Sequence, residues 1–315
     1  MLVMSRYGDF EIPNEKDLVA NSLRLYGEWA QSEIDTLAHF IEEGDAVADV
    51  GAFIGTHARA FSTIVGESGK VYAFEPNSSI YLLLEENAKK SPSRNISTLP
   101  FALGAIKKEM RIVNKLDSNQ GATRLDTCCG TNYQKVVEVK PLDSFGLGAI
   151  DFIKADVEGM ELAVLVGSDE AINKYKPTIF LEINSLEASS GILEWARHRH
   201  YLTYGLISDA FNPLNFNRVQ KNIFGQAKEC GLFLIPKDNI GKFLDRIERL
   251  KLAEIRTIDD LALLLLHKFQ YAYEVLAQSA AASKLGIGYS SPEQRKMWYF
   301  KMHRHFDKWI ILLKK

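Results

Sequence analysis

Several acidic residues and glycines fall where short apolar runs end, and residues of these types could bind and act on a small ligand. One apolar run ends around Asp49 and is followed by Gly51 and Gly55, a second ends in Glu75, and a third ends at Asp156. Carboxylates can bind hydroxyl or ammonium groups and can accept protons. Glycines let a ligand approach the backbone. The sequence therefore predicts a ligand site that three chain segments share.

The spacing of apolar residues predicts a doubly wound α/β domain that positions these residues. Short apolar runs alternate with helical stripes from about residue 30, which indicates a mostly parallel sheet with helices on both faces. In such sheets ligands bind outside the carboxyl ends of the strands. The predicted strands are 46–50, 71–75, 95–100, 136–140, 150–155, 178–183, 201–206 and 232–235, and the predicted helices are 31–43, 56–65, 79–90, 159–166 and 193–199.

The turn after the first of these strands does not fit a dinucleotide. A dinucleotide fingerprint has glycines at three positions, but alignment on Gly51 places Phe53 and Thr56 at the second and third. A phenylalanine would crowd a pyrophosphate. Glu75, at the end of the next strand, can accept both hydroxyls of a ribose. These features indicate S-adenosylmethionine: a glycine turn, an acid at the end of the next strand and no site for phosphates. Asp49, which we expect to be buried, needs a hydrogen-bond donor such as loop amides or the ligand's ammonium group.

Six segments in this order resemble the FkbM-type family of S-adenosylmethionine-dependent methyltransferases over residues 25–185. They are GDAVADVGAFIGTHA, VYAFEPN, FALG, LDS, IDFIKADVEGMELAVLVG and PTIFLEIN. The resemblance implies a class I, Rossmann-like methyltransferase fold that transfers a methyl group to a hydroxyl oxygen of a sugar, glycan or secondary metabolite.

The resemblance also implies which residues bind the cofactor. Phe53 departs from the family, which commonly has a small polar residue there. The methionine end would be lined by Asp49, Gly51, Ala52, Gly55 and Thr56, the ribose by Glu75 and Asn77, and the adenine by Phe101, Ala102 and Leu103.

A hydroxyl acceptor gains from a base that removes its proton, and three residues are candidates. Asp156 comes first because it follows the predicted strand 150–155, across from the turn after the strand 46–50 that would hold the methyl donor. It could instead cap a helix or bind the methionine ammonium group. Glu158 could be a base or a first-turn acid of the following helix. His57 could be a base or a packing residue. We expect Glu161 to face solvent or to pair with a lysine.

We expect no metal ion. Asp156, Glu158 and Glu182 could gather a divalent cation, but no histidine accompanies them and their spacing is unspecific. Cys128, Cys129 and Cys230 match neither a disulfide framework nor a metal-binding pair.

Composition excludes several classes of function. The chain of 315 residues has a net charge of -2, which provides no overall basic field for nucleic acid. No apolar run is long enough to cross a membrane and no secretory signal is recognisable, so we expect a cytoplasmic protein.

The sequence predicts two parts, a methyltransferase domain over 1–239 and a helical extension over 240–315. The extension ends in a basic, aromatic segment that could pack on the domain or form a homodimer contact. Acceptor specificity is expected from the segments 116–133 and 208–226, where the aromatic and asparagine residues of the second could bind a sugar-like acceptor or pack within the loop.

Two other functions remain open at this point. One is a nicotinamide-dependent oxidoreductase, against which Phe53 argues. The other is a non-catalytic protein that keeps the methyltransferase fold only to bind partners.

Overall fold

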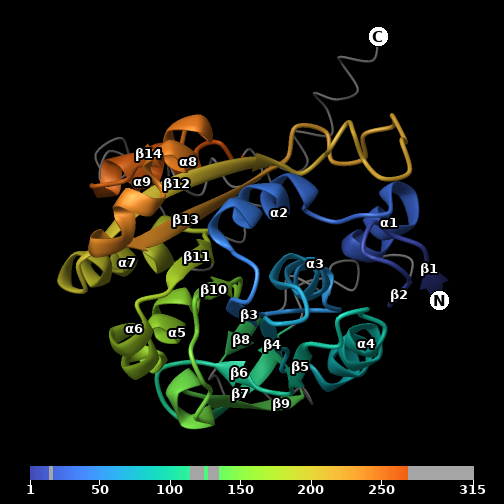
Figure 1. Ribbon diagram of the computed structural model, residues 1–315, viewed down its shortest axis with the longest axis horizontal. Coiled ribbons are helices and arrows are strands. Elements are labelled where there is room, and N and C mark those ends of the chain that lie inside the picture. Colours follow the sequence, from blue (N-terminus) through green and yellow to red (C-terminus); the bar gives the residue numbers. More distant parts are fainter. Residues whose placement is uncertain (14–16, 114–123, 127–134, 269–315) are drawn as a thin grey trace, which may run out of the picture.

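An eight-stranded sheet forms the centre of the protein (Figure 1), whose computed structural model describes residues 1–13, 17–113, 124–126 and 135–268. The five strands nearest the site are parallel, whereas β13 is antiparallel to both of its neighbours, β11 and β12. In spatial order the strands are β14 (Ala253–Glu254), β12 (Tyr201–Asp209), β13 (Lys228–Pro236), β11 (Thr178–Glu182), β10 (Phe152–Ala155), β3 (Ala46–Val50), β4 (Lys70–Phe74) and β5 (Ile96–Leu99).

Helices pack on both faces of this sheet, as a doubly wound fold requires. Successive residues of β3 point to opposite faces: Val47 joins an apolar cluster with α2 and α3, whereas Ala48 joins one with α5, α7 and α9. The helices are α1 (Leu18–Tyr26), α2 (Gln31–Leu37), α3 (Thr56–Val65), α4 (Ser78–Lys89), α5 (Glu161–Gly167), α6 (Asp169–Tyr175), α7 (Leu186–His198), α8 (Leu244–Arg249) and α9 (Ile258–Leu265).

The order of the strands reverses between β3 and β10. The chain runs from β3 outward through β4 to β5, and then returns to the other side of β3 as β10 and continues to β11. The carboxyl ends of β3 and β10 therefore meet in the middle of the sheet, where a doubly wound fold binds its ligand.

A second, four-stranded sheet lies in the chain between β5 and β10. Its order is β6–β9–β7–β8, and it contains the predicted strand at 136–140. Its strands are β6 (Ala102–Leu103), β7 (Lys108–Val113), β8 (Arg124–Asp126) and β9 (Val136–Lys140).

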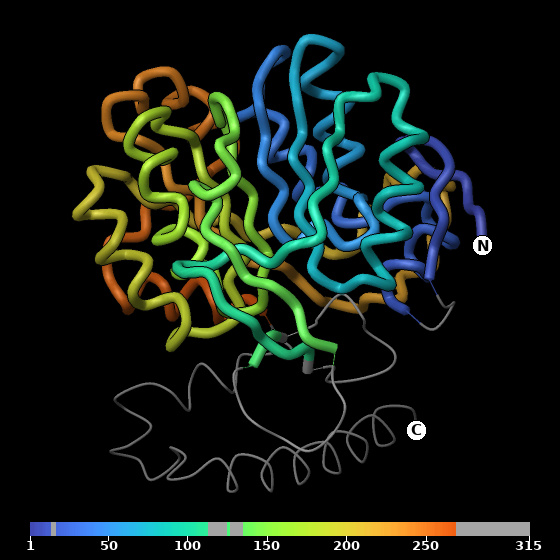
Figure 2. The backbone as a smooth tube through the Cα atoms, turned by 90° about the horizontal axis from the view of Figure 1, so that it is seen from below, coloured from blue at the N-terminus to red at the C-terminus, as the bar shows by residue number. Residues whose placement is uncertain are grey.

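The first 26 residues add elements that the apolar pattern does not predict. The strands β1 (Leu2–Val3) and β2 (Phe10–Glu11) pair, and the α1 helix follows them. Figure 2 shows this segment beside α4, where the Glu11 backbone N–H donates to Asn87 Oδ1 at 2.6 Å. The apolar side chains of β2 and α1 form one cluster with Ile54, against which Phe53 packs, so the N-terminal segment covers the turn after β3.

The C-terminal part packs on the same sheet as far as residue 268. One strand, β14, interrupts the predicted helical extension because residues 253–254 pair with the free edge of β12. The basic aromatic end of the chain and the dimer contact predicted for it lie outside the described residues. Within the described part, no helix combines the length and the apolar character that a membrane span needs.

Candidate active site

The turn after β3 passes directly against the end of β10. Gly51 has a φ of +82°, and a Cβ atom placed on it would lie 2.0 Å from the carbonyl oxygen of Asp156. The backbone N–H groups of Gly51 and Ala52 both donate to Phe74 O, at 3.0 and 2.9 Å. Glycine at position 51 is thus required by the close approach of two strand ends.

Glu75 lies at the end of β4 with both carboxylate oxygens held by backbone amides. Oε1 accepts from Asn77 N at 2.7 Å, and Oε2 accepts from Phe53 N at 3.1 Å. Burial raises the pKa of Glu75 to about 7, although both hydrogen bonds oppose the rise. A carboxylate has about four acceptor positions, so about two remain beyond these two bonds.

Phe53 acts through its backbone as well as its side chain. Its φ of +50° lies in the left-handed region, and this conformation accompanies the hydrogen bond from its N–H to Glu75. The side chain packs against the N-terminal cluster. Gly55 N donates to Ala52 O at 2.8 Å. The turn amides of Gly51, Ala52, Phe53 and Gly55 therefore all donate to protein acceptors.

Asp49 and Lys154 are opposite each other on β3 and β10, and both are fully buried. Lys154 Nζ lies 3.8 Å from Asp49 Oδ1 and 3.6 Å from Asp156 Oδ2. Burial alone would lower the pKa of Lys154, but the carboxylates of Asp156 and Asp49 outweigh it and raise the pKa. Within the described chain, neither carboxylate oxygen of Asp49 has a hydrogen-bond partner.

Asp156 and Glu182 lie side by side at the ends of neighbouring strands. Each comes directly after a residue of the register pair Ala155 and Leu181 of β10 and β11. The Asp156 side chain is 31% exposed. Its partial burial and the Glu182 carboxylate raise its pKa well above the ordinary value. Burial would also raise the pKa of Glu182, but the Lys268 ammonium group, Asp156 and Lys154 lower it to about 2. Asp156 therefore binds a proton more readily than Glu182 does.

The turn after β10 is closed by Glu161, and our expectation that Glu161 faces solvent is wrong. Its side chain is buried, and Oε1 accepts from Gly159 N at 3.0 Å and from Val157 N at 3.3 Å. Glu158 has a φ of +51° and precedes α5, so it lies in this turn and not in the first turn of the helix. Glu161 therefore fixes the turn that carries Asp156 and Glu158.

His57 is buried in α3, next to Thr56, which begins the helix and is also buried. His57 Nε2 lies 3.0 Å from Glu33 Oε1 of α2, and both side chains are buried. The ring thus joins α3 to α2.

The residues assigned to the adenine have different surroundings. Ala102 and Leu103 form β6, and both side chains are buried, Leu103 in the main core. Phe101 remains partly exposed against Phe145, with Lys140 Nζ 3.7 Å from its ring centroid. Phe101 is thus the member of this group whose side chain a ligand can reach.

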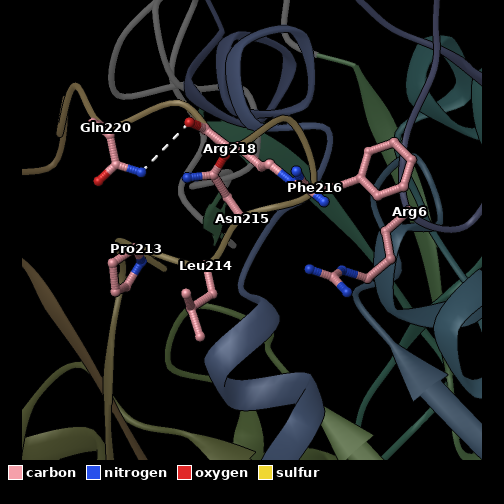
Figure 3. Close-up of a pocket in the computed structure, with 7 residues that line it drawn as sticks. All are labelled: Arg6, Pro213, Leu214, Asn215, Phe216, Arg218 and Gln220. Carbon is pink, nitrogen blue, oxygen red and sulfur yellow. Dashed lines mark hydrogen bonds between the residues drawn. The ribbon is translucent and has the colours of Figure 1, made fainter.

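The two predicted acceptor segments have different outcomes. The segment 116–133, including Cys128 and Cys129, lies outside the described residues except for residues 124–126. In the loop between β12 and β13, Phe211 and Phe224 pack on Tyr26 of α1 with ring centroids 5.4 and 5.7 Å apart. Figure 3 shows a cavity on this loop, lined by Arg6, Pro213, Leu214, Asn215, Phe216, Arg218 and Gln220.

Asn212 and Asn217 also hold this loop in place. Asn212 Nδ2 donates to Glu28 Oε1 at 2.7 Å, and Asn217 Nδ2 donates to Leu25 O at 3.1 Å. Packing therefore accounts for several of the residues proposed for sugar binding. Among the described residues, no group of three or more His, Cys, Asp or Glu side chains is arranged to hold a metal ion.

Sequence reasoning missed Lys154, Lys268 and Glu33, which contact the predicted site residues. Lys154 has a signal in the sequence, because a lysine inside the apolar run 150–155 needs a buried partner. Glu33 and Lys268 lie on distant segments whose contacts with the site depend on the fold.

Comparison with known proteins agrees with this geometry. A sequence model described as the methyltransferase FkbM domain matches residues 49–204. These residues are an FkbM methyltransferase domain. The domain belongs to the S-adenosylmethionine-dependent methyltransferases, and S-adenosylmethionine is its cofactor.

The domain also resembles individual proteins. The chain is 30% identical over 142 residues to the hexuronic acid methyltransferase AglP of Haloferax volcanii, covering 45% of this chain and 57% of AglP. The chain thus spans little more than half the length of this relative. The structure of methyltransferase FkbM from Methylobacillus flagellatus KT is 18% identical with a TM-score of 0.37, covering 60% of this chain and 43% of that one. A SAM-dependent methyltransferase from Aquifex aeolicus is 17% identical with a TM-score of 0.37, covering 68% and 92%.

We predict that Gly51→Ala costs more than its backbone conformation explains. Gly146 is a matched control, because it also has a positive φ (+58°) but a Cβ there would meet no described atom within 4 Å. Gly146→Ala should lower the free energy of unfolding by about 1 kcal/mol. Gly51→Ala should lower it by roughly 2 kcal/mol more, because the strand ends must separate. Equal losses in urea unfolding would show that contact with Asp156 does not require this glycine.

We also predict that Glu161→Gln changes how stability depends on pH. Burial raises the pKa of Glu161 from its ordinary 4.5 to about 7, against the hydrogen bonds from Gly159 and Val157. The contribution of this group to stability is therefore complete below pH 4.5 and is lost as the pH rises through 7.

Glutamine does not titrate, so the variant should gain on the wild type by up to roughly 3 kcal/mol between pH 4.5 and pH 8. Urea unfolding at several pH values measures this difference. Parallel stability profiles for the two proteins would contradict the assignment of a buried, titrating Glu161.

Proposed function

We propose that this protein methylates a hydroxyl oxygen of a sugar, with a hexuronic acid or its glycoside as the acceptor class, and uses Asp156 as the base. The FkbM domain and the resemblance to a hexuronic acid methyltransferase support the reaction class. The observation that carries the proposal is the position of Asp156. Asp156 directly follows β10, its backbone oxygen lies against the turn after β3, and its carboxylate is partly exposed.

The residues at the carboxyl ends of the strands are of the types that the cofactor needs. Glu75 offers two acceptor positions to the ribose hydroxyls, and its orientation is fixed by Phe53 N and Asn77 N. Phe101 would contact the adenine, and the turn of Gly51, Ala52, Gly55 and Thr56 would hold the methionine end. When bound, S-adenosylmethionine supplies a methyl group on a positively charged sulfur, which becomes a neutral thioether when the methyl group leaves.

Asp49 is assigned to the methionine end through its buried carboxylate. The sequence left loop amides and a ligand ammonium group as its possible donors. The amides of Gly51 and Ala52 donate to Phe74 O, and Lys154 is the near cation, at 3.8 Å. We therefore assign Asp49 an indirect role, in which its buried carboxylate balances the charge of Lys154 next to the residues proposed for the methionine end.

Asp156 removes the acceptor proton in this proposal. Burial and the Glu182 carboxylate raise its pKa, and Lys154 opposes the rise, so its ionised form is a stronger base than an ordinary aspartate. Glu158, two residues further on, lies in the same turn and can orient the acceptor. His57 is buried against Glu33, and this contact supports a role in joining α2 and α3.

The turn amides argue against a nicotinamide dinucleotide. A pyrophosphate binds backbone N–H groups that have no other acceptor. Here the N–H groups of Gly51, Ala52 and Gly55 donate to backbone oxygens, and that of Phe53 donates to Glu75. The Glu75 carboxylate would also repel the phosphates.

We expect the protein to transfer a deuterated methyl group from S-adenosylmethionine to methyl β-D-glucuronide, forming a methyl ether. A carboxylate acceptor would need no base and would give a methyl ester, which mild alkali cleaves, whereas an ether survives. Mass spectrometry before and after alkali treatment separates the two products. An alkali-labile product, or stabilisation of the protein by NAD and not by S-adenosylhomocysteine, would contradict the proposal.

Asp156→Asn should lower kcat for this transfer about 100-fold or more, since a base of this kind contributes 10²–10⁴-fold. Its affinity for S-adenosylhomocysteine, measured by calorimetry, should stay within about threefold of the wild type. Asp238→Asn, which changes an exposed aspartate outside the site, is the matched control and should leave both values unchanged. Full activity of the Asp156 variant would exclude this residue as the base.

A further inference from the structure

Lys268 lies in the interior of the protein among carboxylates at the ends of β11 and β13. Its side chain is fully buried, and Nζ lies 3.1 Å from Glu182 Oε1 and 2.6 Å from Glu229 Oε2. The same group donates to Asn184 Oδ1 at 2.5 Å and to Ile183 O at 3.4 Å. This buried ammonium group keeps its charge, because the two carboxylates beside it outweigh the cost of burial and raise its pKa.

The segment of the chain after the FkbM match positions Lys268. β14 pairs with β12, and α9 begins with a capping box between Thr257 and Asp260. Leu261, Leu264 and Leu265 of α9 are buried in the main core. The apolar face of α9 thus anchors the segment. Lys268, three residues after the helix, is thereby placed at the ends of β11 and β13.

Glu182 connects Lys268 to the proposed base. Glu182 contacts Lys268 directly and follows Leu181, whose register partner Ala155 precedes Asp156. We propose that Lys268 is a positioning residue of the methyl-transfer site, which holds Glu182 in place and whose positive charge helps Asp156 to lose the proton that the two carboxylates share. This inference rests on the proposed function of Asp156 as the base.

Lys268 is one of several charged groups near the carboxylates of Asp156 and Glu182. Asp156 is also faced by Lys154 of β10 at 3.6 Å and by Glu158 of its own turn, which raises its pKa. Beyond them lie charged groups of the neighbouring elements: Asp49 of β3, Glu33 of α2, and Glu229 of β13, whose pKa burial and Glu182 raise to about 8. Lys154 and Lys268 are the two cations among these groups, so removing Lys268 should make the shared proton harder to lose.

The test is a carbon-13 NMR titration of the side-chain carboxyl groups in the full chain, with the Asp156 signal assigned by its loss in Asp156→Asn. In Lys268→Met, the titration of Asp156 should move upward by about one pH unit, because a buried neighbouring charge shifts a pKa by this much or more. Lys268→Arg keeps the charge and should leave the titration close to that of the wild type. Lys237→Met, which removes an exposed lysine, is the matched control and should also leave it unchanged.

Lys268→Gln is the second variant, in case the Lys268→Met protein does not fold. The glutamine amide can still donate to Asn184 and Ile183, although the charge is lost. Stabilisation by S-adenosylhomocysteine shows that each variant is folded. An unmoved Asp156 titration in either folded, uncharged variant would overturn the inference. Because the titration needs no acceptor, failure of methyl transfer to the glucuronide in the wild type would count against the proposed function and not against Lys268.

Discussion

The Lys154 ammonium group is buried between Asp49 and Asp156, and the geometry of the site depends on the balance of these charges. A buried ion is costly unless a partner of opposite charge lies close to it. Asp49 satisfies this condition only in the observed register, in which Lys154 of β10 is opposite Asp49 of β3. The same register brings the turn after β3 so close to Asp156 O that position 51 must be glycine. The ion pair therefore favours the register that places the turn after β3 beside the proposed base.

Two further buried carboxylates hold the turns on either side of this pair. Glu75 receives backbone N–H groups from the donor turn and from the start of α4, and Glu161 receives two from the turn after β10. Each turn is thus held by hydrogen bonds within the protein. Such preorganisation favours methyl transfer, in which catalysis depends mainly on holding donor and acceptor in line.

The sequence predicted the sheet and the residues at its strand ends because periodicity and turn chemistry are local. Gly51, Glu75 and Asp156 each follow an apolar run, so their placement at one edge follows from the parallel topology. Glu161 was misjudged because an acid at a helix start ordinarily faces water, whereas here it folds back on its own turn. Lys268 could not be predicted, since its partner Glu182 is 86 residues away and only the path of α9 brings them together.

A double-mutant cycle on Asp49 and Lys154 tests the central claim most directly. The free energy of unfolding in urea is measured for the wild type, Asp49→Asn, Lys154→Met and the double variant. Lys154→Met leaves the buried Asp49 carboxylate without its cation and should cost about 3–5 kcal/mol. Asp49→Asn should cost less, because Lys154 keeps Asp156 as a partner. The double variant should cost at least about 1 kcal/mol less than the sum of the two single changes. Additive losses would show that the two residues do not interact, and would contradict the role of this pair in building the site.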